Sequence, residues 1–420
     1  MLHVRNQQAS PPAPTAPAAD PPPAVADDGA RTGRKERDPF FDNAKYLAIV
    51  LVAVSHAWTP LRDDSRAASA LYAFVFTFHM PAFILIAGYF SRSFTARPDQ
   101  LKRLITGVGV PYLVFEVLYI LFARAGWGGD DPDLPLSLLD PYYVTWFLVA
   151  LFLWRLTAPI WRLVRHPLPI ALAVAAIASM SPHFGNDLNI QRVLQFLPFF
   201  VLGTMMRREH FTWMRRTEVR ALAVPVLLVA LAVAYWSVGR LDQSWLYRTN
   251  SAQEMGEPGW VGPVMTLALF GCGLLLTVAF LALVPTRRTW YTTLGAGTVY
   301  GYLLHGFVIK ASRWWDWYDV GWVGSPAGRV AVTAIGAVVV TALCTAPVRR
   351  AFRPLVEPSM DWAFRKPQPV LSGGDRAVGD GPLGDRGGPG GAVVRADPPA
   401  RSPGEASAAD GGQRPVSAGG

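Results

Sequence analysis

Six ionisable side chains stand inside long apolar runs of the sequence, where a charge is costly. They are Lys45, His56, His79, Glu116, His305 and Lys310. Ionisable groups at membrane depth are rare, so each of the six is a candidate for chemistry or binding. A histidine exchanges protons near neutral pH, a buried carboxylate can act as a base or orient a histidine, and a lysine can bind an anion.

Lys45 and His56 belong to one predicted helix and are eleven residues apart. Eleven residues make three turns plus about 20°, so both side chains project from the same face, about 16 Å apart along the axis. Asp42 lies on this face one turn before Lys45. The pattern places Lys45 near the cytoplasmic surface and His56 within the membrane. It is equally compatible with a lysine that only anchors the helix and a histidine that only packs between helices.

The remaining ionisable residues are each compatible with more than one role. Pro81 frees the backbone carbonyl of Thr77, so His79 either points into a cavity beside a kink or satisfies that carbonyl. Glu116 either orients a histidine, acts as a base, or stays neutral and forms a hydrogen bond across helices. Lys310 is expected near the outer surface, with its amine extended toward water.

Membrane helices must position these side chains, because the chain is too apolar for an ordinary soluble domain. Of its 420 residues, 51% are hydrophobic and 16% are charged, whereas soluble domains average about 25% charged residues. Ten apolar segments are separated by short charged loops, at residues 43–61, 69–91, 104–123, 142–163, 167–182, 192–206, 220–238, 260–284, 292–312 and 327–348. The fifth and sixth are short for a bilayer of about 30 Å, which needs roughly 20 residues. The sequence therefore predicts an all-α polytopic integral membrane protein with about ten transmembrane helices.

Basic residues concentrate in every second loop, which indicates the orientation of the chain. Lysine and arginine gather in the loops that are cytoplasmic when the N-terminus is cytoplasmic, and acidic residues favour the opposite loops. The positive-inside rule then predicts that both termini are cytoplasmic. Composition further predicts a disordered Pro/Ala-rich cytoplasmic tail at 1–38, a ten-helix membrane domain at 39–353, and a cytoplasmic tail at 354–420 that is disordered from about residue 367.

The signatures of several other protein classes are missing. The net charge of +9 comes from basic residues beside apolar runs, and no nucleic-acid-binding motif is present. No Gly-Lys-Ser/Thr phosphate loop or Cys-x-x-Cys pair occurs. Cys272 and Cys344 both lie in apolar segments and predict no disulfide framework. No spacing of the histidines argues for a metal site, so neither a metal nor a permanently bound cofactor is expected.

Four stretches between residues 40 and 310 share features with one known family. They are Phe41-Asp42-Asn43-Ala44-Lys45 leading to Ser55-His56, Phe78-His79-Met80-Pro81-Ala82-Phe83 with Gly88-Tyr89-Phe90, Trp146-Phe147-Leu148 with the later Arg192 and Phe196-Leu197-Pro198-Phe199-Phe200-Val201-Leu202-Gly203, and Tyr302-Leu303-Leu304-His305. In this order they resemble the membrane acyltransferase-3 family. The first resembles the Asp-x-x-(Lys/Arg)-x10-His signature of its fucose-4-O-acetylase-like branch. Much of the family has arginine where this chain has Lys45, so bidentate recognition of a phosphate is not expected here.

The resemblance implies transfer of an acyl group, usually acetyl from acetyl-CoA, to a hydroxyl of a sugar, glycolipid or other small acceptor. A hydroxyl is a weak nucleophile until a base removes its proton, and His56 is the candidate base; an acyl-histidine intermediate is the alternative. His79 is expected to polarise the thioester carbonyl or to orient the acceptor, and Glu116 and His305 complete the candidate catalytic residues. The negative charges of CoA would be met by Lys45, Arg92, Arg97, Lys102 and Arg103.

Two other functions are compatible with the same residues. A secondary transporter would use the intramembrane histidines and glutamate as a proton relay, although the sequence shows no repeated halves. A non-catalytic scaffold or sensor would use them only for packing. In every case the lipid bilayer is an expected partner and nucleic acid is not. Family resemblance and composition together suggest a multi-pass protein of a bacterial plasma membrane.

Overall fold

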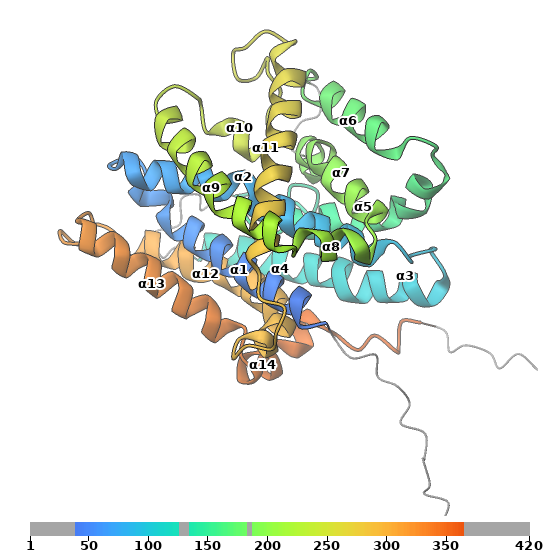
Figure 1. The fold of residues 1–420 in the computed structure, drawn as a ribbon. Helices are drawn as coiled ribbons and strands as arrows, with labels where there is room; N and C mark the ends of the chain where they lie inside the picture. Colours follow the sequence, from blue (N-terminus) through green and yellow to red (C-terminus); the bar gives the residue numbers. More distant parts are fainter. Residues whose placement is uncertain (1–37, 126–133, 183–186, 365–420) are drawn as a thin grey trace, which may run out of the picture. The chain divides into compact units, whose positions relative to one another are not determined.

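The computed structural model describes residues 38–125, 134–182 and 187–364, and all regular elements within them are helical (Figure 1). The longer helices are α1 (Pro39–Trp58), α2 (Arg66–Ser91), α4 (Val110–Arg124), α5 (Trp146–Leu163), α7 (Ile190–Met205), α9 (Thr217–Ser237), α11 (Val261–Leu283), α12 (Thr298–Trp314) and α13 (Pro326–Leu343). The shorter ones are α3 (Pro98–Leu104), α6 (Pro167–Ala178), α8 (Arg208–Met214), α10 (Ser244–Tyr247) and α14 (Ala346–Val356), with helical turns η1 (Thr59–Leu61), η2 (Ile105–Gly109), η3 (Asp187–Asn189) and η4 (Thr292–Gly297). The predicted all-α fold class is confirmed for the described residues.

Each of the ten predicted apolar segments contains a helix, but these helices differ in their capacity to cross a membrane. Seven described spans are long and apolar enough: Pro39–Leu61, Arg66–Ser91, Pro98–Arg124, Trp146–Leu163, Thr217–Ser237, Val261–Leu283 and Pro326–Leu343. The α6 helix has 12 residues, α7 has 16 and α12 has 17. The structure is thus that of a multi-pass membrane protein. The count of ten crossings, the cytoplasmic placement of both termini and the three domain boundaries stay predictions, and most of the expected tails lies outside the described residues.

Local sequence signals explain where the helices that carry the site begin. The Asp38 side chain caps α1 by accepting the Phe40 amide at 3.1 Å. Pro39 occupies the first helical position, where an N–H group would have no partner within the helix. Ser65 caps α2 by accepting the amide of Ala68 at 3.3 Å. Both helices therefore start at defined residues, which sets the depth of every side chain that follows.

The α2 helix continues through Pro81, which removes one backbone donor from the helix. The Thr77 carbonyl, left without that donor, lies against α11, where a Cβ on Gly273 would come within 2.9 Å of its oxygen. His79 bonds to the Val75 carbonyl at 2.8 Å. Satisfying the Thr77 carbonyl, one of the two roles expected for His79, is therefore not observed.

The first two helices are the most enclosed of the membrane spans. In their most apolar stretches, 61% of the residues of the α1 span and 67% of those of α2 are buried, against 11% in α9 and in α13. The α2 helix contacts α1, α5, α7, α9 and α11. Exposed leucine, valine and isoleucine side chains on α9 and α13 suit contact with lipid chains. The polar residues of α1 and α2 thus lie among protein side chains.

Two glycines let α2 and α7 approach each other closely. A Cβ on Gly88 would collide with the carbonyl oxygen of Phe200, and a Cβ on Gly203 would collide with that of Leu85. Small residues allow membrane helices to pack backbone against backbone, where dispersion contacts hold them together. This contact fixes α7 against α2, and both helices contribute side chains to the cavity described next.

Candidate active site

A cavity of about 260 Å³ lies at the end of α1 opposite to its N-terminus. Its lining residues come from six helices, η1 and the segment before α5: Val52, His56, Thr59, Tyr72, Phe76, His79, Met80, Tyr143, Val144, Trp146, Arg192, Phe196, Leu246, Tyr247 and Tyr302. Aromatic and apolar side chains form most of the wall, and a few polar groups stand among them. This composition is typical of a site for a small organic molecule.

His56 connects the polar groups of this cavity. Its Nδ1 shares a hydrogen bond of 3.0 Å with the Tyr143 hydroxyl, and the centre of its ring lies 5.5 Å from that of His305. Burial raises the pKa of the Tyr143 hydroxyl above its usual value, so the phenol stays protonated at neutral pH. When that hydroxyl accepts the Nδ1 proton, Nε2 of His56 keeps its lone pair and can take up a proton.

His79 also lines the cavity and is almost completely buried. Its Nδ1 donates to the Val75 carbonyl at 2.8 Å, because a carbonyl oxygen can only accept. In the neutral ring, Nε2 is therefore the nitrogen without a proton. His79 can accept a hydrogen bond from a hydroxyl in the cavity, and it donates from Nε2 only when the ring is protonated.

His305 lies beside the cavity, next to His56. Its Nδ1 is 2.7 Å from the Tyr302 carbonyl oxygen and 3.0 Å from that of Gly301, so this nitrogen carries a hydrogen. Its Nε2 is buried and has no hydrogen-bond partner among the described residues. The fold thus brings the three histidines predicted from separate segments into one region.

Glu116 is completely buried and holds the backbone that precedes α5. Its carboxylate accepts the Tyr142 amide at 2.9 Å and the Thr145 hydroxyl at 2.5 Å. Tyr143, between these residues, has a φ of 57°, which a tyrosine adopts only with support from its surroundings. Of the roles expected for Glu116, the structure therefore shows a hydrogen bond between segments. Through Tyr142 and Thr145 it positions Tyr143.

Lys310 lies in the same region and differs from its prediction. Its side chain is buried, and its ammonium group lies 5.0 Å from the ring centre of Tyr142 and 5.2 Å from that of Tyr143. The expectation that this amine extends toward water is wrong, because the side chain is buried. An ammonium group at this distance from aromatic faces gains a favourable cation–π interaction.

Arg192 and several tyrosines line the cavity although the sequence pattern did not single them out as site residues. The Arg192 Nε donates to the Tyr247 carbonyl at 2.9 Å, and its guanidinium lies 4.6 Å from the Trp146 ring centre. The hydroxyls of Tyr72 and Tyr247 share a hydrogen bond of 2.8 Å. The signal that could have found Arg192 was its place among the residues that carry the family resemblance, at the start of an apolar segment. The tyrosines come from unrelated segments, so no spacing links them.

Lys45 and Arg92, two of the cations expected to bind CoA, flank a pair of aromatic rings. Lys45 forms an ion pair with Asp42 at 2.8 Å and lies 5.9 Å from the Phe90 ring centre. The Arg92 guanidinium lies 3.9 Å from the ring centre of Tyr89, and the two rings are 5.3 Å apart. These cations therefore form one cluster near the N-terminal end of α1, about 16 Å along the axis from His56.

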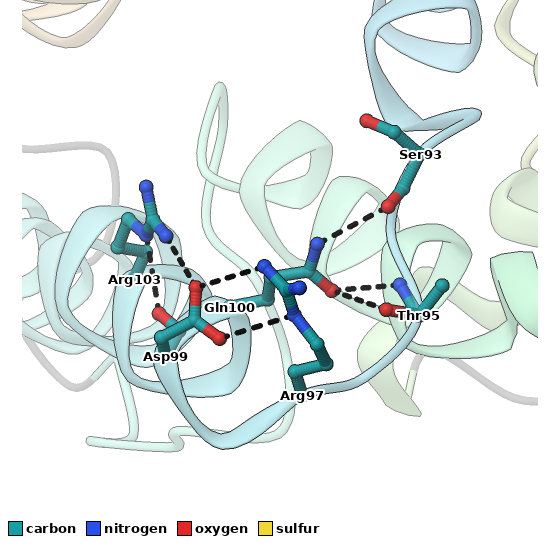
Figure 2. A network of polar contacts seen from close by, with 6 residues as sticks. All are labelled: Ser93, Thr95, Arg97, Asp99, Gln100 and Arg103. Atoms are coloured by element: carbon teal, nitrogen blue, oxygen red, sulfur yellow. Dashed lines mark hydrogen bonds and ion pairs between the residues drawn. The ribbon is translucent and has the colours of Figure 1, made fainter. Parts of the chain in front are cut away.

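The other three cations expected to bind CoA each have a carboxylate partner. Arg97 and Arg103 both pair with Asp99, with nitrogen–oxygen distances of 3.3 and 2.5 Å (Figure 2). Lys102 pairs with Asp361 at 3.0 Å. All three pairs lie at the surface and involve residues next to or within α3.

Beside this network, the Gln100 side chain forms hydrogen bonds to the loop between α2 and α3 (Figure 2). Its side-chain oxygen accepts the Thr95 amide at 2.7 Å, and its amide nitrogen donates to the Ser93 carbonyl at 3.1 Å. The loop is thus tied to the first turn of α3, and the ion pairs with Asp99 extend from the same turn. These contacts explain how the basic loop is held in shape.

Among the described residues, no group of three or more His, Cys, Asp or Glu side chains is placed to hold a metal ion.

A family model described as an acyltransferase domain matches residues 38–349. The match includes the cavity residues and all five cations discussed above. Comparison with curated proteins and with solved structures finds no match.

Proposed function

This chain belongs to the membrane acyltransferase-3 family and is an acyltransferase, and we propose that it moves an acetyl group from a CoA thioester to a hydroxyl of a sugar or glycolipid. The proposal depends mainly on His56, whose ring lines the cavity while Tyr143 contacts its Nδ1. This arrangement leaves Nε2 for an incoming hydroxyl. The aromatic wall suits the apolar faces of a sugar ring. The proposed location is the plasma membrane of a bacterium.

In the proposed reaction, Nε2 of His56 takes the proton of the acceptor hydroxyl while the hydroxyl oxygen attacks the thioester carbonyl carbon. The tetrahedral intermediate collapses with cleavage of the carbon–sulfur bond. The imidazolium returns its proton to the departing thiolate, so CoA leaves as a thiol and His56 is neutral again. Tyr143 would hold the ring in the required tautomer by accepting the Nδ1 proton in a hydrogen bond.

The other candidate residues take supporting roles in this proposal. His79 orients the acceptor, because its neutral Nε2 can accept a hydrogen bond from an acceptor hydroxyl. Glu116 positions the segment that carries Tyr143. His305 packs beside His56 and helps to hold the ring of the base in place.

The donor is proposed to bind toward the N-terminal end of α1. Arg92 is exposed, and no described carboxylate pairs with it, so its charge is available to a CoA phosphate. Lys45 lies in the same cluster but already pairs with Asp42. Arg97, Lys102 and Arg103 remain candidates, ranked lower because each has a carboxylate partner. The long flexible pantetheine arm would carry the thioester from this cluster toward His56.

The test compares wild-type protein with His56→Gln in detergent micelles. Release of the CoA thiol from acetyl-CoA is measured with a panel of neutral and acidic monosaccharides, and acetylated products are identified by mass spectrometry. Loss of a general base should lower turnover by about 10²–10⁴-fold. Acetyl-CoA binding, measured by isothermal titration calorimetry, should be retained because His56 does not contact the phosphates in this proposal.

His166→Gln is the matched control, since His166 is exposed and lies outside the cavity. It should retain wild-type turnover. Undiminished turnover in His56→Gln would contradict the assignment of the base. Folded wild-type protein that binds no acetyl-CoA would argue against acetyl-CoA as the donor and in favour of another acyl donor.

A further inference from the structure

The cavity around His56 has an unbalanced charge. Among its described lining residues, Arg192 is the one side chain with a permanent charge, and no aspartate or glutamate is present. The neighbouring cavity, which shares Tyr247 with it, is lined by Asp63 and Asp242 as well as Arg62. Carboxylates therefore occur at this end of the molecule, but the described ones line the neighbouring cavity and not the one around His56.

Arg192 itself has few polar contacts. Its Nε donates to the Tyr247 carbonyl, and its guanidinium lies over the Trp146 ring. The two terminal nitrogens make no hydrogen bond, and no carboxylate lies within ion-pair distance, among the residues that the structure describes. A guanidinium has five N–H groups, so most of its donors remain for something inside the cavity.

Two nearby arginines show how such charges are otherwise accommodated. Arg62 has a carboxylate neighbour, Asp63, at 3.5 Å and donates to the Tyr247 hydroxyl. Arg248 does not line the cavity: it is buried behind Phe196, has no carboxylate partner among the described residues, donates to the Gln195 carbonyl at 3.0 Å and packs against aromatic rings. Neither presents an unpaired guanidinium to the cavity around His56. An enclosed cation without a counter-ion is unfavourable, so a ligand that supplies the negative charge gains affinity.

We propose that the acceptor carries a negatively charged group, a carboxylate or a phosphate on a sugar, and that the terminal nitrogens of Arg192 bind it. This deepens the proposed function, on which it rests, by naming the substrate class. Guanidinium nitrogens match the oxygens of a carboxylate or phosphate in a two-point hydrogen bond. Trp146 holds the guanidinium plane from one side. The sugar ring then lies among the aromatic side chains, with a hydroxyl near His56.

The experiment measures binding of three probes in the absence of acetyl-CoA: glucuronic acid, glucose 1-phosphate and glucose. They share one sugar scaffold and differ in charge. Isothermal titration calorimetry in detergent micelles should show at least one of the two anions binding wild-type protein about tenfold more tightly than glucose. Preference for glucuronic acid would identify a carboxylate as the source of the charge, and preference for glucose 1-phosphate a phosphate. Arg192→Gln should remove the preference, and Arg192→Lys should keep part of it, because a lysine retains the charge without the planar fork.

Arg66→Gln is the control variant. The Arg66 Nε also donates to a backbone carbonyl, that of Tyr235 at 3.1 Å, and its guanidinium lies 4.7 Å from the ring centre of the same residue. Arg66 is exposed and outside the cavity, so its loss should leave the preference unchanged. Thermal unfolding confirms that each variant is folded.

Wild-type protein that binds none of the three probes, or binds glucose as tightly as both anions, overturns the proposal. An undiminished preference in folded Arg192→Gln also overturns it. If Arg192→Gln loses turnover with neutral and acidic acceptors alike while its probe binding is unchanged, Arg192 stabilises the transition state and does not select an anionic acceptor. This outcome also overturns the proposal. Since no acetyl-CoA is present, His56→Gln should bind the probes normally. Failure of the acyl-transfer proposal can therefore be distinguished from failure of this one.

Discussion

The two ends of α1 carry positive charge in different ways. Toward its N-terminal end, Lys45 pairs with Asp42, and in the adjoining loop Arg97 and Arg103 share Asp99. At the cavity end, Arg192 has no carboxylate partner among the described residues and lies between an aromatic ring and an open space. The first region has more cations, but Lys45, Arg97 and Arg103 each pair with a carboxylate. The second region has fewer cations, but no described carboxylate neutralises the charge of Arg192.

This difference teaches that the number of cations in a region is a poor guide to where an anion binds. Exposed ion pairs contribute little to stability, because water and salt screen them. An anionic ligand at such a site must first compete with the existing carboxylate. An enclosed arginine without a partner offers its full charge to a ligand. The cavity end is therefore expected to respond more strongly to substitution than the loop near the N-terminal end.

The largest effect among the following tests should come from Glu116→Gln. In glutamine an NH₂ group that cannot accept replaces one carboxylate oxygen, so a single uncharged oxygen must accept from both the Tyr142 amide and the Thr145 hydroxyl, and the segment that carries Tyr143 should loosen. We expect a loss of about 1–3 kcal/mol in stability, together with lower turnover. Thermal unfolding and CoA release measure the two effects.

Glu254→Gln is the control for this substitution. Glu254 also accepts from a backbone amide and a hydroxyl, those of Ser251 at 2.7 and 2.8 Å, but it lies outside the cavity. It should leave turnover unchanged. Equal loss of turnover in both variants would show that Glu116 acts only through overall stability.

A smaller effect is expected from Tyr143→Phe, which removes the hydroxyl that contacts Nδ1 of His56. Loss of one such hydrogen bond should lower kcat about tenfold and leave the KM for acetyl-CoA unchanged. Because burial raises the pKa of the Tyr143 hydroxyl, this group does not titrate between about pH 5 and 9. The variant should therefore keep the shape of the wild-type pH–rate profile at a lower level. A changed profile would show that Tyr143 exchanges protons itself or alters the protonation of His56.

The smallest effects are expected at the other end of α1. Arg92→Gln and Lys45→Gln should each raise the KM for acetyl-CoA by about three- to tenfold with little change in kcat, because each removes one charge that can meet a phosphate. The effect should shrink as salt is added. Steady-state kinetics at two ionic strengths measures it, and a fall in kcat with unchanged KM would contradict the donor assignment.

Asp99→Asn sharpens the same comparison. It frees Arg97 and Arg103 from their shared partner without touching the cavity. If these arginines lie away from the donor, acetyl-CoA affinity should change by less than about twofold, since exposed pairs are weak. A clear gain in affinity would place both arginines at the donor site.

The helices of the fold could be predicted from the sequence because apolar length and helical periodicity are local properties. Every predicted apolar segment contains a helix, and Lys45 and His56 do lie on one helix, α1. The short fifth and sixth segments also correspond to short helices, α6 and α7. Whether these shorter helices cross the membrane depends on the neighbours around them, which local composition does not contain.

The candidate site was only partly predictable. His56 and His79 line the cavity as ionisable residues in apolar segments can be expected to do. Arg192 was named only as part of the family resemblance and Tyr143 not at all, and neither was assigned to the site, because an arginine at the start of an apolar segment resembles a topology signal and a tyrosine before a helix resembles an interfacial anchor. Lys310 was misplaced for a similar reason: its burial, beside the rings of Tyr142 and Tyr143, depends on residues far away in the chain.

The sequence by itself determined the helical class, the membrane character, the shared helix of Lys45 and His56 and the resemblance to an acyltransferase family. Each depends on residues that are close in the chain or on their order along it. Only the tertiary structure decided which histidines come together, that Glu116 holds the Tyr143 segment, and which cations already have carboxylate partners. The physical reason is that a hydrogen bond or an ion pair depends on a distance in space. Residues as far apart in the chain as His56 and Tyr143 reach such a distance only after the helices have packed.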